Sequence, residues 1–324
     1  MRRVCYDKFG EPAKVLRLEE VATPKPKRGE VLLKVSHAPV HPADLVGIRG
    51  LYVRPRDFPA VPGLECVGTV EALGPGVKSV KVGGRYVSTA RNGTWADEII
   101  VSADQLIPAP RGVPDKLACQ LFVNPLTAYG MLNMVERPGA IIQTAAGSAV
   151  GRLVDQLGRK QGRKVVNIVR NDKTARDLKK HGAVHVVSSS TKNWQAKVRR
   201  AVGKTPIVAA IDPVAGETAV ELLPLLSKGG ELILYGALSG KPVPIGAMSV
   251  AGNDLAVRGF WLMPWMQNTA KTRRNAAFRS LANMVAKGEL EIPIAGVHDL
   301  KDFKNAVRAA ETPGRLGKIV LKAS

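Results

Sequence analysis

Apolar residues occur in short runs along the whole chain, and the spacing of these runs changes near Pro114. Before Pro114 the runs are separated by Gly and Pro turns. In the run at 63–77, small and apolar residues alternate with Glu65, Thr69 and Glu71, and a Gly-Pro-Gly turn closes the run. Alternation with a period of two is typical of a strand with one exposed face. The first third of the chain is therefore predicted to be a β-rich domain.

After Pro114 apolar runs alternate with segments that have helical spacing. The helix expected at 171–183 has Asp172 as its cap and Gly182 as its stop. Strands that alternate with helices of about ten residues predict a parallel, doubly wound sheet. The expected strands are 140–142, 165–169, 183–189, 206–216 with its turn, 231–238, 254–265 and 314–324, and the expected helices are 115–135, 171–183, 192–203, 217–230, 268–290 and 300–311.

The stretch 139–170 reads as a strand, a tight turn of small residues, a helix and a second strand. In such a unit the backbone of the turn can approach a pyrophosphate closely, and the N-terminus of the helix supplies N–H groups. The sequence therefore predicts a dinucleotide site at the turn AAGSAVG. The expected contacts with the cofactor are Ala146, Gly147, Ser148, Ala149, Val150 and Gly151.

Arg170 ends the second strand, about 20 residues beyond the turn, where the ribose of the cofactor is expected to lie. A carboxylate at this point would bind the 2′-hydroxyl of NAD, whereas a guanidinium pairs with the 2′-phosphate of NADP. Arg170 therefore predicts NADPH as the cofactor. The alternative is a solvated arginine at the end of a strand.

Composition limits the class of protein. With 324 residues, 45% hydrophobic and 5% aromatic content, the chain suits a soluble α/β protein of two domains. Its cysteines lie far apart, which favours reduced thiols over a disulfide framework. Because no apolar run is long enough to span a membrane and the N-terminus has no hydrophobic signal core, we expect a cytoplasmic protein, with a mature mitochondrial matrix protein as the alternative.

The formal net charge of +21 predicts weak, nonspecific binding of polyanions. Residues 152–204 contain 15 Lys and Arg but only three carboxylates, so the half that would hold an adenosine phosphate is the most basic part of the chain. The charge also leaves open a different class of function, in which a cofactor-binding fold serves as a nucleic-acid-binding or structural protein. A generally basic surface without a function is a further alternative.

The order of parts resembles the medium-chain dehydrogenase/reductase superfamily over essentially the whole chain. The matching segments are HPADLVGIRGLY (41–52), FPAVPGLECVGTVEALGPGVKSVKVGGR (58–85), GTWADE (93–98), VNPLTAYGML (123–132), AAGSAVG (145–151) and RGFWL (258–262). The resemblance implies an α/β protein with an N-terminal chaperonin-like (GroES-like) β-barrel domain and a Rossmann doubly wound parallel sheet. The implied domains are 1–118, completed by about 266–324, and 119–265.

Zinc-dependent alcohol dehydrogenases of this superfamily bind catalytic zinc through an early cysteine and a Gly-His-Glu sequence. Here Pro42-Ala43-Asp44 and Gly63-Leu64-Glu65 stand at the matching places. A lone Glu65 cannot supply the three protein ligands of an open tetrahedral site, so we expect no metal. The chain then looks like the zinc-free branch that contains quinone oxidoreductases and 2-enoyl thioester reductases.

The resemblance also implies roles for individual residues. Tyr52 matches the proposed proton donor of the enoyl thioester reductases, and Trp261 matches a tryptophan that lines their acyl pocket. Without the resemblance, Tyr52 would read as a surface aromatic. The implied cofactor contacts are Thr127 near the nicotinamide, the backbones of Tyr235, Gly236 and Ala237 and of Phe260, Trp261 and Leu262 beside the carboxamide, and Lys318 near a phosphate.

This chain departs from the family at His41, where asparagine is usual, and at Ala149 and Gly84, where glycine and aspartate are usual. His41 places a titratable imidazole beside the expected substrate site, as a hydrogen-bond donor or as a replacement for a structural amide. The implied activity is NADPH-dependent reduction of α,β-unsaturated carbonyl compounds, mainly 2-enoyl thioesters, with quinone reduction as the alternative. The implied assembly is a homodimer joined through 231–238 or 256–262.

Overall fold

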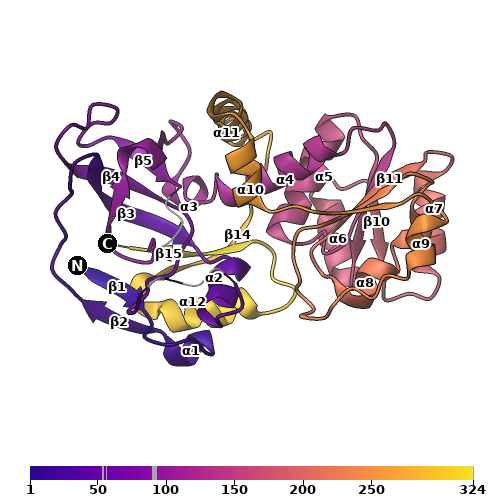
Figure 1. Cartoon of the computed structure of the whole chain (residues 1–324), viewed down its shortest axis with the longest axis horizontal. Helices are drawn as coiled ribbons and strands as arrows, with labels where there is room; N and C mark the ends of the chain where they lie inside the picture. Colours follow the sequence, from indigo (N-terminus) through magenta and orange to yellow (C-terminus); the bar gives the residue numbers. More distant parts are fainter. Residues whose placement is uncertain (53–54, 56, 90–92, 324) are drawn as a thin grey trace. The chain divides into compact units, whose positions relative to one another are not determined.

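The computed structural model of the chain describes residues 1–52, 55, 57–89 and 93–323 (Figure 1). Its internal contacts divide the chain into two compact units. Unit 1 consists of Met1–Val123 and Phe278–Ser324, and unit 2 consists of Asn124–Ala277. The expected domain boundaries, after residue 118 and before residue 266, precede both division points, and they stay predictions of where each domain ends.

Unit 1 is built on a seven-stranded sheet in the order β14-β15-β3-β4-β5-β7, with β6 paired to β3. The last strand of the chain, β15, runs antiparallel to β3 with Val320 opposite Pro39, so the C-terminal segment completes the sheet of the N-terminal segment. The strands are β3 (Glu30–Pro39), β4 (Cys66–Leu73), β5 (Arg85–Ser88), β6 (Glu98–Ser102), β7 (Leu106–Pro108), β14 (Ile294–Asp299) and β15 (Lys318–Lys322).

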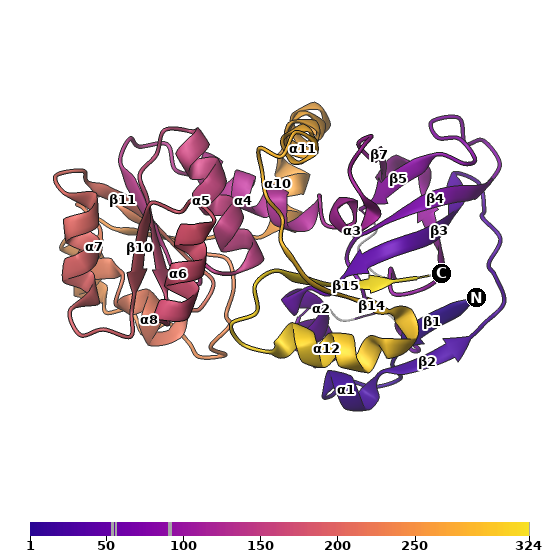
Figure 2. The ribbon, with the colours of Figure 1, turned by 180° about the vertical axis from the view of Figure 1, so that it is seen from behind.

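Helix α12 (Phe303–Glu311) covers part of this sheet and lies beside β14 and β15 (Figure 2). Its buried residues Phe303, Ala306 and Val307 share one hydrophobic core with Leu33 of β3. The remaining elements of unit 1 are the antiparallel pair β1 (Arg2–Cys5) and β2 (Arg17–Glu20), the helices α1 (Pro12–Val15), α2 (Pro42–Ile48) and α3 (Asp115–Ala118), and the 3-10 turns η1 (Ala103–Gln105) and η3 (Leu300–Asp302).

Unit 2 contains a parallel sheet of six strands in the order β10-β9-β8-β11-β12-β13. The chain moves outward from β8 to β10, returns to β11 beside β8, and then moves outward in the other direction. This is the strand order of a Rossmann fold, so the predicted doubly wound sheet is confirmed. The strands are β8 (Ala140–Gln143), β9 (Val165–Val169), β10 (His185–Ser188), β11 (Ile207–Asp212), β12 (Glu231–Leu234) and β13 (Ala256–Gly259).

Helices cover both faces of this sheet because its strands are apolar on both sides. Val166 and Ile168 of β9 pack in one core with Trp194 of α7, whereas Val169 packs in a separate core with Leu178 of α6. In both views β10 lies between α6 and α7 (Figures 1 and 2). The helices are α4 (Val123–Met134), α5 (Ala149–Lys160), α6 (Asp172–Lys180), α7 (Trp194–Val202), α8 (Gly216–Val220), α9 (Ala247–Ala251) and α10 (Leu262–Asn268), and α11 (Lys271–Ala286) crosses the division between the units.

Three local predictions for unit 2 are wrong. The helix expected at 217–230 is only α8 followed by a 3-10 turn, η2 (Leu223–Leu225), because Pro224 cannot donate the hydrogen bond that a continuing α-helix needs. The strand expected at 254–265 ends at Gly259, and α10 begins at Leu262. The cap of α6 is Asn171, whose side chain accepts a hydrogen bond from the Thr174 amide, and not Asp172.

Cys5, Cys66 and Cys119 are buried and free, as the expectation of reduced thiols requires. Burial raises the pKa of the Cys5 thiol to about 11 and raises those of the other two still further. These thiols are therefore protonated near neutral pH. Within residues 1–52, 55, 57–89 and 93–323, no helix has the length and apolar character needed to cross a membrane.

Candidate functional site

The small-residue turn of unit 2 joins the end of β8 to the start of α5. The Ser148 side chain caps the helix by accepting a hydrogen bond from the Gly151 amide at 3.1 Å. The backbone N–H groups of the first turn of a helix have no carbonyl partner within that helix, so those of Ala149 and Val150 suit an anion. Ala149 takes its place in the helix without a left-handed backbone conformation, so alanine fits this position as well as glycine does.

Two glycines in this turn lie where a side chain has no room. A Cβ at Gly151 would lie 2.7 Å from the Cα of Ala146 and 2.8 Å from two backbone oxygens, and a Cβ at Gly147 would lie 2.5 Å from Thr174. The first contact lets α5 start directly against the backbone of the turn, and the second lets α6 approach the turn. The residues present therefore fit the pyrophosphate of a dinucleotide.

Arg152 is a supporting residue that the sequence patterns did not single out. It is buried, its Nε donates a hydrogen bond to the Gly147 carbonyl at 3.2 Å, and its guanidinium pairs with Asp177 of α6. It ties the turn to the next helix. In the sequence, Arg152 appears only as a charged residue among the apolar residues of a helix. A solvated arginine would give the same pattern.

Tyr235 follows β12. Burial raises the pKa of its phenol, and an interaction with the Ser148 side chain partly opposes that rise. Tyr235 and the turn are thus brought together at the carboxyl edge of the sheet, where open α/β sheets bind their ligands. Gly236 and Ala237 follow as exposed residues.

Arg170 is exposed and stands directly after β9, with Asn171 capping the helix that follows. Its position at the carboxyl end of the strand next to β8 is the one that the sequence predicted for a cofactor-selecting residue. Its pairing with a ribose phosphate stays a prediction.

Thr127 is buried in the first half of α4. The same helix approaches Phe260 so closely that a Cβ at Gly130 would lie 2.6 Å from the Phe260 ring. Phe260 is also stacked at a tilt on Trp265, with ring centroids 6.5 Å apart. Phe260 therefore holds α4 and α10 together through its side chain, while its backbone remains the predicted cofactor contact.

Trp261 is the residue that precedes α10, and 48% of its surface is exposed, whereas Leu262 is buried. The role of Trp261 in an acyl pocket stays a prediction.

Tyr52 lies in unit 1, shortly after α2, and is 37% exposed. Backbone hydrogen bonds continue between the end of α2 and Tyr52. The Gly50 amide donates to the Gly47 carbonyl at 2.9 Å, and the Leu51 amide donates to the Val46 carbonyl at 3.1 Å. Gly50 has a φ of 77°, and a Cβ there would lie 2.8 Å from the Phe9 ring. The backbone that leads to Tyr52 is therefore closely confined.

His41 and Lys318, predicted for two separate roles, meet in one buried cluster of unit 1. The Nε2 atom of His41 lies 2.8 Å from Glu65 Oε1, and its Nδ1 atom lies 3.2 Å from Lys318 Nζ. The other Glu65 oxygen accepts hydrogen bonds from the Phe122 and Val123 amides at 2.9 and 3.0 Å. All three side chains are almost inaccessible to solvent.

The position of Glu65 differs from the strand prediction for 63–77. It was placed on the exposed face of a strand, but it precedes β4 and is fully buried. The carboxyl group is tolerated there because the Phe122 and Val123 amides and the His41 imidazole hydrogen-bond to it. Its apolar neighbours in the sequence gave no signal of this cluster, whose other members are far away along the chain.

Hydrogen bonding links the protonation states within the cluster. An ammonium group at Lys318 donates to Nδ1, so Nε2 carries the proton of the neutral imidazole and donates to the Glu65 carboxylate. If Lys318 is a neutral amine and Glu65 a neutral carboxylic acid, His41 carries its proton on Nδ1 instead. The cluster then holds the same total number of protons. Burial raises the pKa of Glu65 and lowers those of Lys318 and His41, which favours neutral groups.

This arrangement does not fit a zinc ion. Both nitrogens of His41 and both oxygens of Glu65 are engaged by other groups of the chain. Across the part of the chain that the structure describes, no three His, Cys, Asp or Glu side chains gather in a way that could hold a metal.

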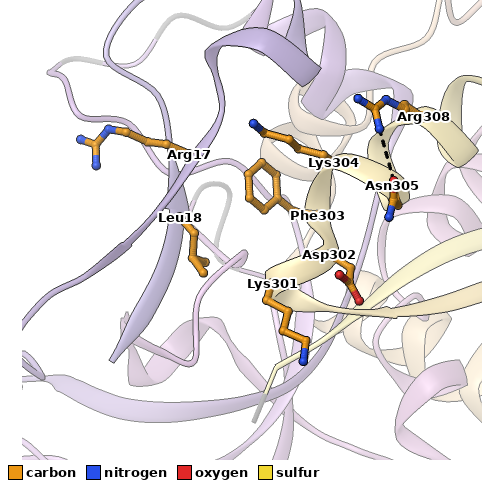
Figure 3. A pocket seen from close by; sticks show the side chains of 8 residues that line it. All are labelled: Arg17, Leu18, Lys301, Asp302, Phe303, Lys304, Asn305 and Arg308. Atoms are coloured by element: carbon orange, nitrogen blue, oxygen red, sulfur yellow. Dashed lines mark hydrogen bonds between the residues drawn. The ribbon is translucent and has the colours of Figure 1, made fainter.

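A surface hollow of unit 1 lies elsewhere, between β2 and α12 (Figure 3). Its basic side chains include Arg17, which pairs with Asp7 and Glu19, and Arg308, which donates to Asn305. None of the predicted site residues lines this hollow. Its lining consists of Arg17, Leu18, Lys301, Asp302, Phe303, Lys304, Asn305 and Arg308.

Comparison with protein families gives two matches. Residues 27–111 match the alcohol dehydrogenase GroES-like domain, which confirms the predicted chaperonin-like domain. Residues 149–278 match the family described as zinc-binding dehydrogenase.

Individual proteins match over nearly the whole chain. The mitochondrial enoyl-[acyl-carrier-protein] reductase of Xenopus tropicalis is 33% identical, over 96% of this chain and 92% of the relative. The structure of a candidate NADPH:quinone reductase from Bacillus thuringiensis is 29% identical, with a TM-score of 0.92 over 100% of this chain and 99% of that one. The Escherichia coli quinone oxidoreductase complexed with NADPH shares the fold, with 24% identity and a TM-score of 0.91 over 99% of this chain and 100% of that one.

Four findings support the same family. They are the strand order of unit 2, its glycine turn, the buried Glu65 in place of a zinc site, and the matches with known proteins. The chain belongs to the medium-chain dehydrogenase/reductase superfamily of oxidoreductases, in the zinc-free branch that contains the 2-enoyl thioester reductases and the quinone oxidoreductases.

Proposed function

We propose that the chain is an NADPH-dependent reductase of α,β-unsaturated carbonyl compounds, with 2-enoyl thioesters as its substrate class. The observation that carries the proposal is the turn of unit 2, where close-packed glycines at the start of α5 are combined with Arg170 at the end of β9. The name of the Xenopus relative supports an enoyl substrate, and the NADPH in the E. coli structure supports the cofactor.

In this proposal each part of unit 2 binds one part of the cofactor. The amides at the start of α5 hold the pyrophosphate, and Arg170 pairs with the 2′-phosphate. Thr127 and the backbones after β12 and β13 hold the nicotinamide end. The bound cofactor supplies a hydride to the β-carbon of the enoyl thioester.

Tyr52 completes the reduction by donating its phenolic proton to the α-carbon, so that the carbon–carbon double bond becomes a single bond. A phenol with a pKa near 10 is protonated at pH 7, yet it is acidic enough to protonate an enolate carbon. The Tyr52 residue is 37% exposed, so part of it lies at the surface of unit 1. Trp261 contributes an apolar wall for the acyl chain.

The test is the oxidation of NADPH by crotonyl-CoA, compared for the wild type and Tyr52→Phe. Phenylalanine keeps the ring but has no proton to give, so we expect kcat to fall by about a hundredfold or more. Tyr86→Phe is the matched control, because Tyr86 is a buried tyrosine of β5. Unchanged crotonyl-CoA reduction in Tyr52→Phe would remove Tyr52 from the mechanism, and no turnover by the wild type would reject enoyl thioesters.

Quinone reduction is the second candidate, and the similarity to the Bacillus thuringiensis structure favours it. Reduction of a quinone requires no protonation of carbon, so Tyr52→Phe should leave it intact. An enzyme that reduces a simple quinone but not crotonyl-CoA would support this alternative. The compartment stays a prediction, and the mitochondrial name of the Xenopus relative supports the matrix.

A further inference from the structure

We propose that His41 is a positioning residue for Tyr52, acting from its place between Lys318 and Glu65. The inference rests on the proposed function, because it assigns Tyr52 a proton to deliver. The catalytic role considered for His41 itself is replaced by an indirect one, since a side chain that is 2% exposed and bonded at both ring nitrogens has no free polar atom for a substrate.

His41 fixes the start of α2. It is the residue that precedes the helix, and its amide donates to Asp44 Oδ2 at 2.7 Å. Its ring is held from opposite sides by β15, through Lys318, and by the residue before β4, through Glu65. A short helix has little stability of its own, so these tertiary contacts determine where it begins.

Helix α2 transmits this position to Tyr52. The helix has only seven residues, and backbone hydrogen bonds continue beyond it through the amides of Arg49, Gly50 and Leu51. The Arg49 side chain also pairs with Glu11 and Glu311, which fixes the far end. A displacement at His41 therefore reaches the residue next to Tyr52 along one continuous hydrogen-bonded segment.

The same cluster also holds the first residue of α4. Glu65 accepts hydrogen bonds from Phe122 and Val123, and Val123 is the first residue of that helix. The same helix carries Thr127, the predicted contact of the nicotinamide. One buried carboxyl group thus links the segment of the proposed proton donor with the start of a helix expected to contact the cofactor.

The charged and titratable groups that face the cluster are Asp44, Cys66, Cys119 and Arg315, in addition to its own members. Removal of His41 would leave Glu65 and Lys318 buried without their shared partner. Buried groups deprived of a partner move toward other partners or toward water. We expect α2 to shift with them.

The kinetic test is a double-mutant cycle with His41→Gln and Tyr52→Phe. Glutamine places an amide nitrogen as many bonds from Cα as Nε2, so it can keep the bond to Glu65 while losing the bond to Lys318. In the Tyr52 background we expect kcat for crotonyl-CoA to fall by about tenfold with little change in the KM for NADPH. In the Tyr52→Phe background the same substitution should have no further effect. An equal loss in both backgrounds would overturn the proposal.

A second measurement does not depend on the reaction. In hydrogen–deuterium exchange, His41→Leu and His41→Gln should speed the exchange of amides at 45–51, and the matched control His37→Asn should not, because His37 bonds to Ser36 and not to α2. Unchanged exchange at 45–51 in a folded His41→Gln protein would reject the positioning role. If the wild type fails to reduce crotonyl-CoA, only the proposed function is rejected. Hydrogen–deuterium exchange at 45–51 then still tests whether His41 positions the segment that leads to Tyr52.

Discussion

Gly151 packs against the backbone of Ala146, and a Cβ at residue 151 would come within 2.7 Å of the Ala146 Cα. Because backbone atoms cannot rotate away as a side chain can, Gly151→Ala must displace the turn or the start of α5. We expect the Kd for NADPH to rise by about tenfold or more, which corresponds to about 1.4 kcal/mol or more.

Fluorescence titration with NADPH measures this change. Gly246→Ala is the matched control, because the nearest atom to a Cβ at that position of unit 2 is Ser249 Oγ at 3.6 Å, an ordinary contact. Equal affinity of Gly151→Ala and the wild type would contradict the assignment of this turn to the cofactor.

Arg170 is predicted to discriminate between the two nicotinamide cofactors. Replacement by serine removes the charge that pairs with a 2′-phosphate but leaves a group that suits a hydroxyl. We expect the KM for NADPH to rise by about tenfold to a hundredfold and that for NADH to change little. Arg176→Ser, at an exposed position of α6, is the control for a general loss of positive charge. A parallel change in both KM values would show that Arg170 is only a surface charge.

The buried carboxyl group of Asp44 should make the free energy of unfolding depend on pH. Burial raises the pKa of this carboxyl group to about 7, and its Oδ1 atom has no hydrogen-bond partner. The unfolded state releases the proton near pH 4, so the folded state binds more protons between about pH 4 and 7. The free energy of unfolding should therefore fall as the pH rises through this window, by at most about 1.4 kcal/mol per pH unit.

Urea unfolding at pH 5 and pH 7 measures this slope for the wild type and Asp44→Asn. Asparagine can still accept the hydrogen bond from the His41 amide but does not titrate, so its curve should be flatter. Asp104→Asn, at an exposed residue of η1, should keep the wild-type slope. If the free energy of unfolding of Asp44→Asn kept the wild-type dependence on pH, groups other than Asp44 would be its cause.

The edge strand β13 is the predicted dimer contact. Of the two segments considered, 231–238 is excluded as a free edge because β12 pairs with β11 on one side and β13 on the other. All four residues of β13 are exposed, and an exposed edge strand favours pairing with another chain. We expect the wild type to be a homodimer in light scattering.

Val257→Lys should shift this dimer toward the monomer, because lysines brought together on two edge strands repel each other. Val184→Lys is the control, since Val184 is exposed and lies before β10, at the other edge of the sheet. A monomeric mass for the wild type at the assay concentration would reject the dimer.

Much of the cofactor half could be predicted from the sequence because its signals are local. Strand β8, the small-residue turn, helix α5 and strand β9 follow one another within 139–170, and each has its own pattern of apolar or small residues. The errors near Pro224 and Gly259 arose where short elements end, since an apolar run does not show by itself whether it continues as a strand or as a helix.

The sequence alone determined the fold class, the turn with its glycines and the position of Arg170, because these depend on neighbours along the chain. Only the tertiary structure decided the surroundings of His41. Its partners, Glu65 and Lys318, lie 24 and 277 positions away, and these ionisable groups are tolerated in the core because they hydrogen-bond to His41 there. A long-range contact of this kind leaves no periodic pattern in the sequence, so His41 is an isolated exception there, whereas in the fold Glu65 and Lys318 bond to its two ring nitrogens.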